Sequence, residues 1–173
     1  MVIKHATQAG NPIIRRKSKA VSRITSPATT RTVRNLVDSM RFQGLVGMAA
    51  PQIGINQRIF VTEIRKTKTR KQKEVDSLRV FINPKIVSRS KRLDAGYEGC
   101  GSVASAGLFG DVARSHAITV TAFDEKGKRF KLRATGLLAR IIQHENDHLD
   151  GKVFLDRMTN MGSIMSREEY LRR

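Results

Sequence analysis

The sequence has few or none of several features, and each shortage excludes a class of protein. Its 173 residues include one cysteine, Cys100, so no disulfide can form within the chain, as expected in a reducing compartment. The N-terminus lacks the apolar stretch of a secretory signal, and no run approaches the roughly 20 apolar residues needed to cross a bilayer. We therefore expect a cytoplasmic protein with no membrane partner, with an organelle matrix or an infected host cell left open.

Acidic and aromatic residues are scarce as well. Asp and Glu total 15 against 33 Lys and Arg, which leaves a net charge of +18, and aromatic residues make up 5%. Such an excess attracts polyanions such as RNA, DNA or acidic membranes, and contact with the ribosome or its RNA is one hypothesis. The charged run at residues 65–73 is expected to be a loop that either aids solubility or contacts nucleic acid. Because no aromatic residues are interleaved with the charge, sequence-specific RNA recognition is not expected.

The order of patterned segments favours an α+β fold. A helix is expected at residues 28–43, followed by a glycine- and alanine-rich turn at 44–54. Strands are expected at 58–64 and 79–88, and a hairpin of 118–123 with 128–133. Because strands precede a late helix, we predict mostly antiparallel sheets packed around a central helix. We expect a monomer with a single domain, residues 1–173, in which residues 1–10 and 162–173 are flexible or peripheral.

The most informative stretch is residues 143–151, QHENDHLDG, which contains an HExxH motif. His144 and His148 stand four positions apart, so on a helix they lie on the same face and can bind one metal ion. Glu145 lies beside them, placed to move protons for a bound water. Apolar residues at helical spacing precede the motif, with Thr135 as the expected N-cap and Gly151 as the stop. Two histidines satisfied within a core remain the alternative.

Two histidines need a third protein ligand if a fourth position is to stay open for water. His5 lies near the start of the chain, and His116 is expected to begin a strand as a structural or exposed residue. Cys100 lies between Gly99 and Gly101, which let the backbone turn sharply or approach a ligand. A thiolate binds zinc or ferrous iron strongly. Taken alone, Cys100 fits a small buried residue; beside an HExxH motif we favour the ligand.

Three segments in this order resemble the motifs of the peptide deformylase family. The family's late motif, QHExDHLxG, is matched in full by residues 143–151. Its middle motif, EGCLS, appears as EGCGS at residues 98–102, and its early motif, GxGxAAxQ, appears as LVGMAAPQ at residues 45–52. The ordered trio is more specific than any one motif, and the resemblance extends over roughly residues 10–160.

The resemblance implies a metallohydrolase that removes the formyl group from the N-terminal formyl-methionine of newly made polypeptides and releases formate. It implies one divalent metal ion held by Cys100, His144 and His148. That ion is expected to be Fe²⁺, with Zn²⁺, Ni²⁺ and Co²⁺ as alternatives. Glu145 matches the general acid and base. The implied substrates are formyl-Met nascent peptides.

The resemblance also implies residues that bind substrate and stabilise the reaction. The side-chain amide of Gln52 and the backbone N–H of Gly101 match the two donors to the formyl oxygen, and Gly47 matches a backbone contact with the peptide. We hypothesise that Glu98 and Arg114 hydrogen-bond to the metal ligands or to their neighbours and so orient the site. For Arg114, an ordinary surface cation is an equal alternative.

Several positions depart from the family pattern. The first glycine of the early motif is Leu45, and the leucine of the middle motif is Gly101. Ala104 stands where many relatives have proline, and residues 105–110 look slightly expanded. These changes affect the substrate pocket and leave the implied ligands, Glu145 and Gln52 in place.

Two other functions remain open at this level. A catalytically impaired relative that binds the ribosome or RNA would keep the fold and the charge without turnover. An HExxH metalloprotease would recruit a third ligand downstream, where the chain offers Glu168 and Glu169 near its very end. A structural zinc site normally has four protein ligands. Only three good ligands are recognised in this sequence, which favours a metal site with an open position over a structural one.

Overall fold

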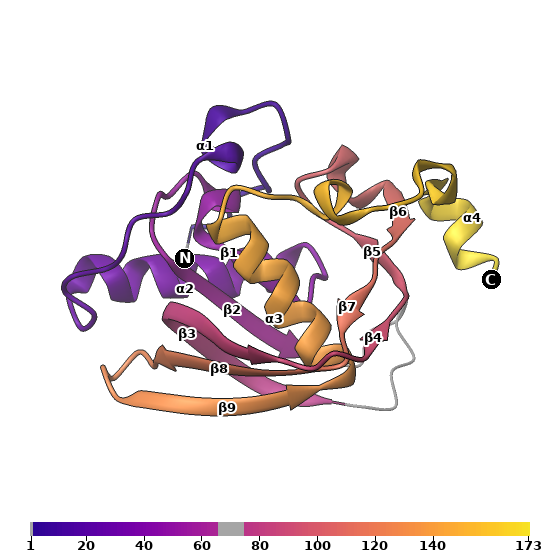
Figure 1. The fold of residues 1–173 in the computed structure, drawn as a ribbon. Helices are drawn as coiled ribbons and strands as arrows, with labels where there is room; N and C mark the ends of the chain where they lie inside the picture. The colour runs from indigo at the N-terminus through magenta and orange to yellow at the C-terminus, as the bar shows by residue number, and fades with distance from the viewer. Residues whose placement is uncertain (1, 66–74) are drawn as a thin grey trace.

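A five-stranded antiparallel sheet is the largest element of the structure (Figure 1). The structure is a computed structural model that describes residues 2–65 and 75–173, so nearly all of the charged run at 65–73 lies outside the described residues. The strand order is β1-β2-β3-β8-β9. The bounds are β1 Gly47–Ala49, β2 Ile59–Ile64, β3 Asp76–Arg89, β8 Ala117–Phe123 and β9 Arg129–Thr135.

Two smaller sheets and several helices complete the described fold. One small sheet has the order β10-β6-β5 and the other pairs β4 with β7. Their bounds are β4 Leu93–Asp94, β5 Tyr97–Gly99, β6 Leu108–Asp111, β7 Arg114–Ser115 and β10 Met165–Ser166. The α-helices are α1 Pro12–Arg15, α2 Pro27–Phe42, α3 Gly136–Leu149 and α4 Arg167–Leu171. Short 3₁₀ helices are η1 Ala50–Ile53, η2 Ala104–Ala106, η3 Phe154–Arg157 and η4 Met161–Ser163.

Strand β2 is buried on both faces because helices pack on either side of it. Successive side chains of a strand point to opposite faces. Ile59 and Val61 therefore join a core cluster with Leu36 of α2, whereas Phe60 joins a second cluster with Ile142 of α3. The sheet is thus held between α2 and α3, and Figure 1 shows α3 lying across it.

The predicted helices and strands are confirmed in type, with one correction. The expected helix at 28–43 is α2, and the expected hairpin is β8 paired with β9 through its whole length. Residues 44–54 are not only a turn: Gly47–Ala49 forms β1, which pairs with β2, and η1 follows. The small side chains that suggested a turn have another cause, because α3 packs directly on β1.

Helix α3 contains both histidines of the HExxH motif. Thr135 is its N-cap residue as predicted, although its side chain makes no capping hydrogen bond. Gly151 follows the C-cap with φ of +74°, a left-handed conformation that favours glycine. A Cβ there would lie 2.4 Å from the carbonyl oxygen of Arg15, so glycine also lets the end of α3 approach the end of α1.

The ends of the described chain lie against the rest of the fold. The backbone N–H of Thr7 donates to Gln52 O at 2.7 Å, and that of Ala9 donates to Ser102 O at 2.7 Å. At the other end, β10 pairs with β6 and α4 follows it. None of the helices in the described ranges has both the length and the apolar character needed to cross a membrane.

We predict that Phe60→Ala lowers the free energy of unfolding by about 3–5 kcal/mol, because it leaves a cavity in the core. Phe60 is fully buried and stacks on Phe81 with 4.5 Å between ring centroids. Chemical denaturation measures the change. The matched control is Phe42→Ala at the end of α2, where the side chain is 59% exposed, and a change within about 0.5 kcal/mol is expected. Equal losses in the two variants would contradict this core assignment.

Candidate metal centre

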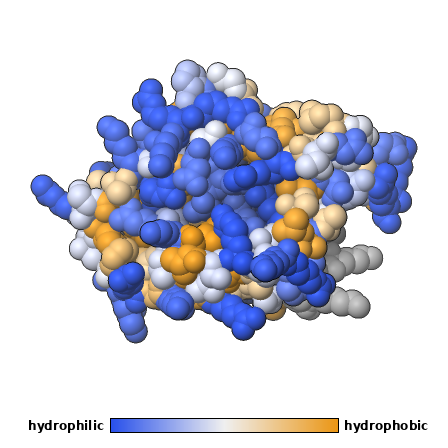
Figure 2. All heavy atoms as spheres, viewed as in Figure 1, coloured by the Kyte–Doolittle hydropathy of each residue, from blue (hydrophilic) through white to orange (hydrophobic). Residues whose placement is uncertain are grey.

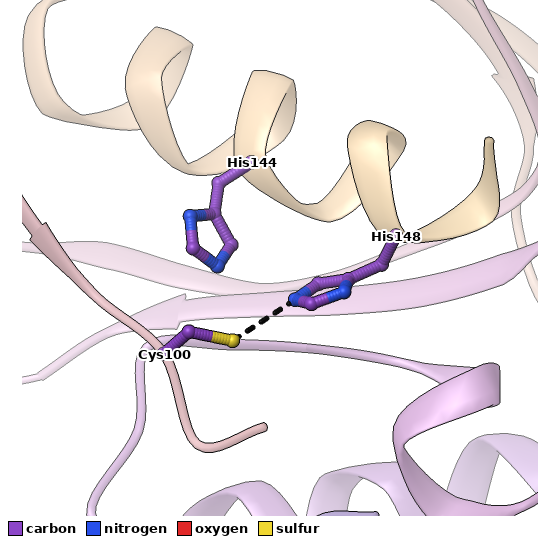
Figure 3. Close-up of side chains that lie close together, drawn as sticks. All are labelled: Cys100, His144 and His148. Atoms are coloured by element: carbon purple, nitrogen blue, oxygen red, sulfur yellow. Dashed lines mark hydrogen bonds between the residues drawn. The ribbon is translucent and has the colours of Figure 1, made fainter. Parts of the chain in front are cut away.

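Three donor side chains from two distant segments meet beside α3 (Figure 3). Cys100 follows strand β5, whereas His144 and His148 lie one turn apart on α3. Cys100 Sγ lies 3.2 Å from His148 Nε2, and one ligand atom from each residue lies within 4.8 Å of the others. The structure therefore brings together the cysteine and the histidines that the sequence suggested as ligands.

The donor set fits a divalent metal ion such as zinc or ferrous iron. One sulfur and two imidazole nitrogens are ligands that both ions accept. A ligating thiol must lose its proton, and the surroundings of Cys100 favour that. Burial alone raises the pKa of Cys100, but the adjacent His148 and His144 outweigh it and hold the pKa well below its ordinary value. The backbone N–H of Ser102 also donates to Sγ, at 3.4 Å.

Glu98 holds His144 in place from behind. Its Oε2 lies 2.9 Å from His144 Nδ1, so the other ring nitrogen, Nε2, is directed towards Cys100 and His148. The carboxylate also accepts two hydrogen bonds of 2.9 Å from Arg114 and one of 2.9 Å from Arg140. Burial by itself raises the pKa of Glu98, but His144 and Arg114 outweigh it and lower the pKa strongly.

Arg114 is a buried member of this network and not a surface cation. Its side chain is 6% exposed, and its Nη1 donates to Asp147 Oδ2 at 2.5 Å. Asp147 also accepts hydrogen bonds from Arg157 of η3. The ion pairs thus connect β5, β7, α3 and η3. Asp147, which stands between the two histidines in the sequence, therefore has a structural role.

Glu145 is not part of this network and lines a pocket beside the three donors. His144 lines the same pocket, and Glu145 Oε2 has no hydrogen-bond partner among the described residues. Burial raises the pKa of Glu145 to about 7. A Cβ at Gly47 would lie 2.4 Å from Glu145 Oε1, so the glycine in β1 leaves the room that this carboxylate occupies.

Gln52 presents its amide nitrogen to the same place. Its Oε1 accepts a hydrogen bond of 2.8 Å from the backbone N–H of Ala49, which fixes the orientation of the amide. Its Nε2 therefore faces Ser102 Oγ at 3.3 Å and Cys100 Sγ at 3.7 Å. A buried N–H donor directed at a metal centre can stabilise an oxygen that becomes negatively charged.

The pocket beside these groups has a volume of about 480 Å³. Gly47, Gln52, Cys100 and Gly101 line it together with the first histidine and the glutamate of the motif. Leu137 and Ile141 of α3 and Tyr170 of α4 also line it. Tyr170 stacks on Phe109 with 4.1 Å between ring centroids. The C-terminal helix is therefore part of the pocket wall.

The remaining histidines do not belong to the group of three donors, although His5 lines the pocket. His5 is exposed and its ring packs edge-on against Phe42. His116 lies between β7 and β8, with Nδ1 2.5 Å from Asp94 Oδ2. This is the structural position that was expected for His116.

Sequence reasoning missed Arg140, whose guanidinium also donates to the carbonyl oxygens of Asp94, Gly96 and Val112. Its position one helical turn before His144, on the same face of α3, was a signal that could have identified it. The stacking of Tyr170 on Phe109 had no local signal, because α4 reaches β6 only through the tertiary fold.

Comparisons with known proteins agree with this geometry. The family model described as polypeptide deformylase matches residues 3–163. A peptide deformylase of Desulforudis audaxviator is 41% identical over 169 residues, which cover 98% of this chain and 100% of that protein. These matches favour a deformylase over a metalloprotease or a binding module.

Solved structures show the same mixed helix and antiparallel-sheet fold. A class I type b peptide deformylase from Acinetobacter baumannii superposes with a TM-score of 0.86 at 28% identity, covering 92% of this chain and all of that one. A peptide deformylase from Synechococcus elongatus, solved with actinonin, gives a TM-score of 0.79 at 36% identity, covering 91% of this chain and 80% of that one. The family model and the curated relative each span nearly the whole chain, and on that ground the chain belongs to the peptide deformylase family.

Proposed function

We propose that the pocket is the catalytic site of this deformylase and that Cys100, His144 and His148 hold its metal ion. The observation that carries the proposal is the meeting of these three donors within 4.8 Å of one another. Glu145 and Gln52 line the same pocket. As a deformylase, the protein removes the formyl group from the formyl-methionine of nascent polypeptides and releases formate.

The substrate peptide is proposed to lie in the pocket with its formyl group towards Cys100. A relative from Acinetobacter baumannii was solved with Met-Ala-Ser bound, a peptide of the size that this cavity could receive. Leu137 and Ile141 offer apolar surface to the methionine side chain. The backbone of Gly47, in β1, is proposed to contact the peptide.

The proposed ion is Fe²⁺, with Zn²⁺, Ni²⁺ and Co²⁺ as alternatives that the same donors accept. When bound, a divalent ion supplies Lewis-acid chemistry, lowering the pKa of water and polarising the formyl carbonyl. Glu98 supports the site because its hydrogen bond to His144 Nδ1 fixes the ring and its tautomer. We further propose that α3 is the central helix of a single catalytic domain.

Glu145 is proposed to move the protons of the reaction. Its carboxylate takes a proton from the attacking water and delivers it to the amine that leaves as the C–N bond breaks. An Oε2 that is buried in the pocket wall, without a protein partner among the described residues, suits this role. Gly47 preserves the space in which the carboxylate moves.

Gln52 and Gly101 are proposed to stabilise the formyl oxygen as negative charge develops on it. The Gln52 amide is already oriented by Ala49, so its Nε2 needs little reorganisation to donate to that oxygen. The backbone N–H of Gly101, next to Cys100, is the second proposed donor. Preorganised donors of this kind lower the barrier because they favour the transition state over the ground state.

We predict that Glu145→Gln keeps the metal but lowers kcat by about 10²–10⁴-fold, because the amide cannot accept the proton. The assay measures formate released from formyl-Met-Ala-Ser, and elemental analysis measures the bound metal. Glu125→Gln, at an exposed position in the turn between β8 and β9, is the matched control and should retain wild-type turnover. Full activity in Glu145→Gln would remove the assigned role.

We predict that a chelator abolishes turnover and that Fe²⁺ restores it under anaerobic conditions. The physical reason is that water is a poor nucleophile at neutral pH until a metal lowers its pKa. Reconstitution with each of the four candidate ions identifies the one that supports the fastest reaction. Turnover that persists in the metal-free protein would contradict the metal-dependent mechanism, and an inactive but metal-loaded protein would favour the catalytically impaired alternative.

The positive charge supports a second proposal, that the protein associates with ribosomes and so meets nascent chains. The chain carries a net charge of +18, and hydrophilic side chains cover most of the face seen in Figure 2. Attraction of this kind to RNA releases counterions and weakens as salt rises.

We predict that ribosome association falls by about tenfold or more when salt is raised from about 50 mM to about 200 mM. Co-sedimentation with ribosomes at a series of salt concentrations measures the slope. Bovine serum albumin, an acidic protein, serves as the control for nonspecific pelleting. Equal binding across the series would reject an electrostatic contact.

A further inference from the structure

Two departures from the deformylase motifs lie against each other in the structure. Leu45 stands where the early motif has glycine, and Gly101 stands where the middle motif has leucine. The two positions are far apart in the sequence, yet both line the same pocket. One motif has thus gained the kind of side chain that the other has lost.

The space beside Gly101 is already filled. A Cβ at Gly101 would lie 3.1 Å from Leu45 Cδ1 and 3.2 Å from Ala6 Cβ. These distances are shorter than nine in ten real Cβ contacts, so the neighbours would have to shift, and the remaining carbons of a leucine would need more room. The backbone of Gly101 is not in the left-handed region, so its conformation does not require glycine. The neighbouring side chains are what favour glycine here.

Leu45 is held firmly in this position. Its backbone N–H donates to Met40 O at 3.0 Å, and its carbonyl oxygen accepts a hydrogen bond of 3.1 Å from Arg65 Nη2. Its side chain packs against the core cluster that contains Met40 and Met48. Because the backbone is anchored on both sides, only a change of side-chain conformation can move Leu45 Cδ1 away from Gly101.

The N-terminal segment closes the third side of this contact. Ala6 donates its backbone N–H to Gln43 Oε1 at 3.2 Å. Gln8 Nε2 donates to Gly101 O at 2.8 Å, which ties the segment to the turn after Cys100. Leu45, Ala6 and Gly101 therefore form one packed corner of the pocket.

We propose that Leu45 takes over the role of the leucine that the family motif has where this chain has Gly101. Leu45 is then a specificity-determining residue of the pocket. The proposal rests on the proposed function and adds which residue supplies the apolar wall beside the Cys100 turn. Leu45 presents its side chain to the bound peptide from the β1 side of the pocket. Gly101 keeps its backbone N–H free of a bulky side chain that would collide with Leu45.

A double-mutant cycle of Leu45→Ala, Gly101→Leu and their combination tests the proposal. Each variant is assayed with iron-loaded protein on formyl-Met-Ala-Ser, and its melting temperature is measured separately. Leu45→Ala alone should raise KM by roughly tenfold with a smaller change in kcat, because an apolar contact with substrate is lost. Gly101→Leu alone should lower both kcat/KM and the melting temperature, because the new side chain collides with Leu45.

The combined variant should recover much of both losses. We expect kcat/KM to exceed the product of the two single effects by roughly tenfold, and the melting temperature to exceed the sum of the single shifts by about 3 °C or more. If the effects multiply in kcat/KM and add in melting temperature, the proposal is refuted. A cycle with Gly101→Ala repeats the test with a smaller side chain, so that failure of Gly101→Leu to fold does not prevent a decision.

Leu137→Ala is the matched control. Leu137 is also a half-buried leucine that lines the pocket, but no atom of it lies within 4 Å of a Cβ at Gly101. Its combination with Gly101→Leu should show no coupling, and equal coupling in both cycles would overturn the proposal. If the wild-type protein does not turn over, the proposed function fails, whereas the melting-temperature cycle still tests the contact between Leu45 and Gly101.

Discussion

The rest of the site depends on the hydrogen bonds and ion pairs made by the buried carboxylate of Glu98. Its two oxygens bind His144 and Arg140 of α3 and Arg114 of β7. Glu98 lies in β5, two residues before Cys100. A single side chain therefore fixes the position of α3 relative to the strand that delivers the thiolate.

Burying so many charges is costly unless each is paired. Here the pairing is continued outwards, because Arg114 also binds Asp147, and Asp147 binds Arg157. A buried network in which each charge has partners is rigid and specifies one arrangement. Rigidity is what a metal centre needs, since ligands held in position lose little freedom when the ion binds. The same network leaves Glu145 outside it, directed at the pocket.

Glycines allow the strands and helices around the site to pack closely against one another. Gly47 leaves the space for the Glu145 carboxylate, and Gly99 leaves the space for the ring of Phe109, which would lie 2.7 Å from a Cβ. Neither has a left-handed backbone, so close approach and not backbone freedom explains them. At Gly101 the same principle extends to the pocket wall, where Leu45 fills the room. The glycines of the motifs thus mark contacts between segments.

The sequence by itself determined the local features of this protein. The helix bearing His144 and His148, its stop at Gly151 and the β8–β9 hairpin follow from periodicity and turn chemistry, which act over a few residues. The tertiary structure decided which distant groups meet. Cys100 and His148 are 48 positions apart, and Gln8 reaches Gly101 across 93 positions. The network around Arg114, the approach of Leu45 to Gly101 and the position of Tyr170 could not be predicted from local sequence, because such contacts depend on how whole strands and helices pack.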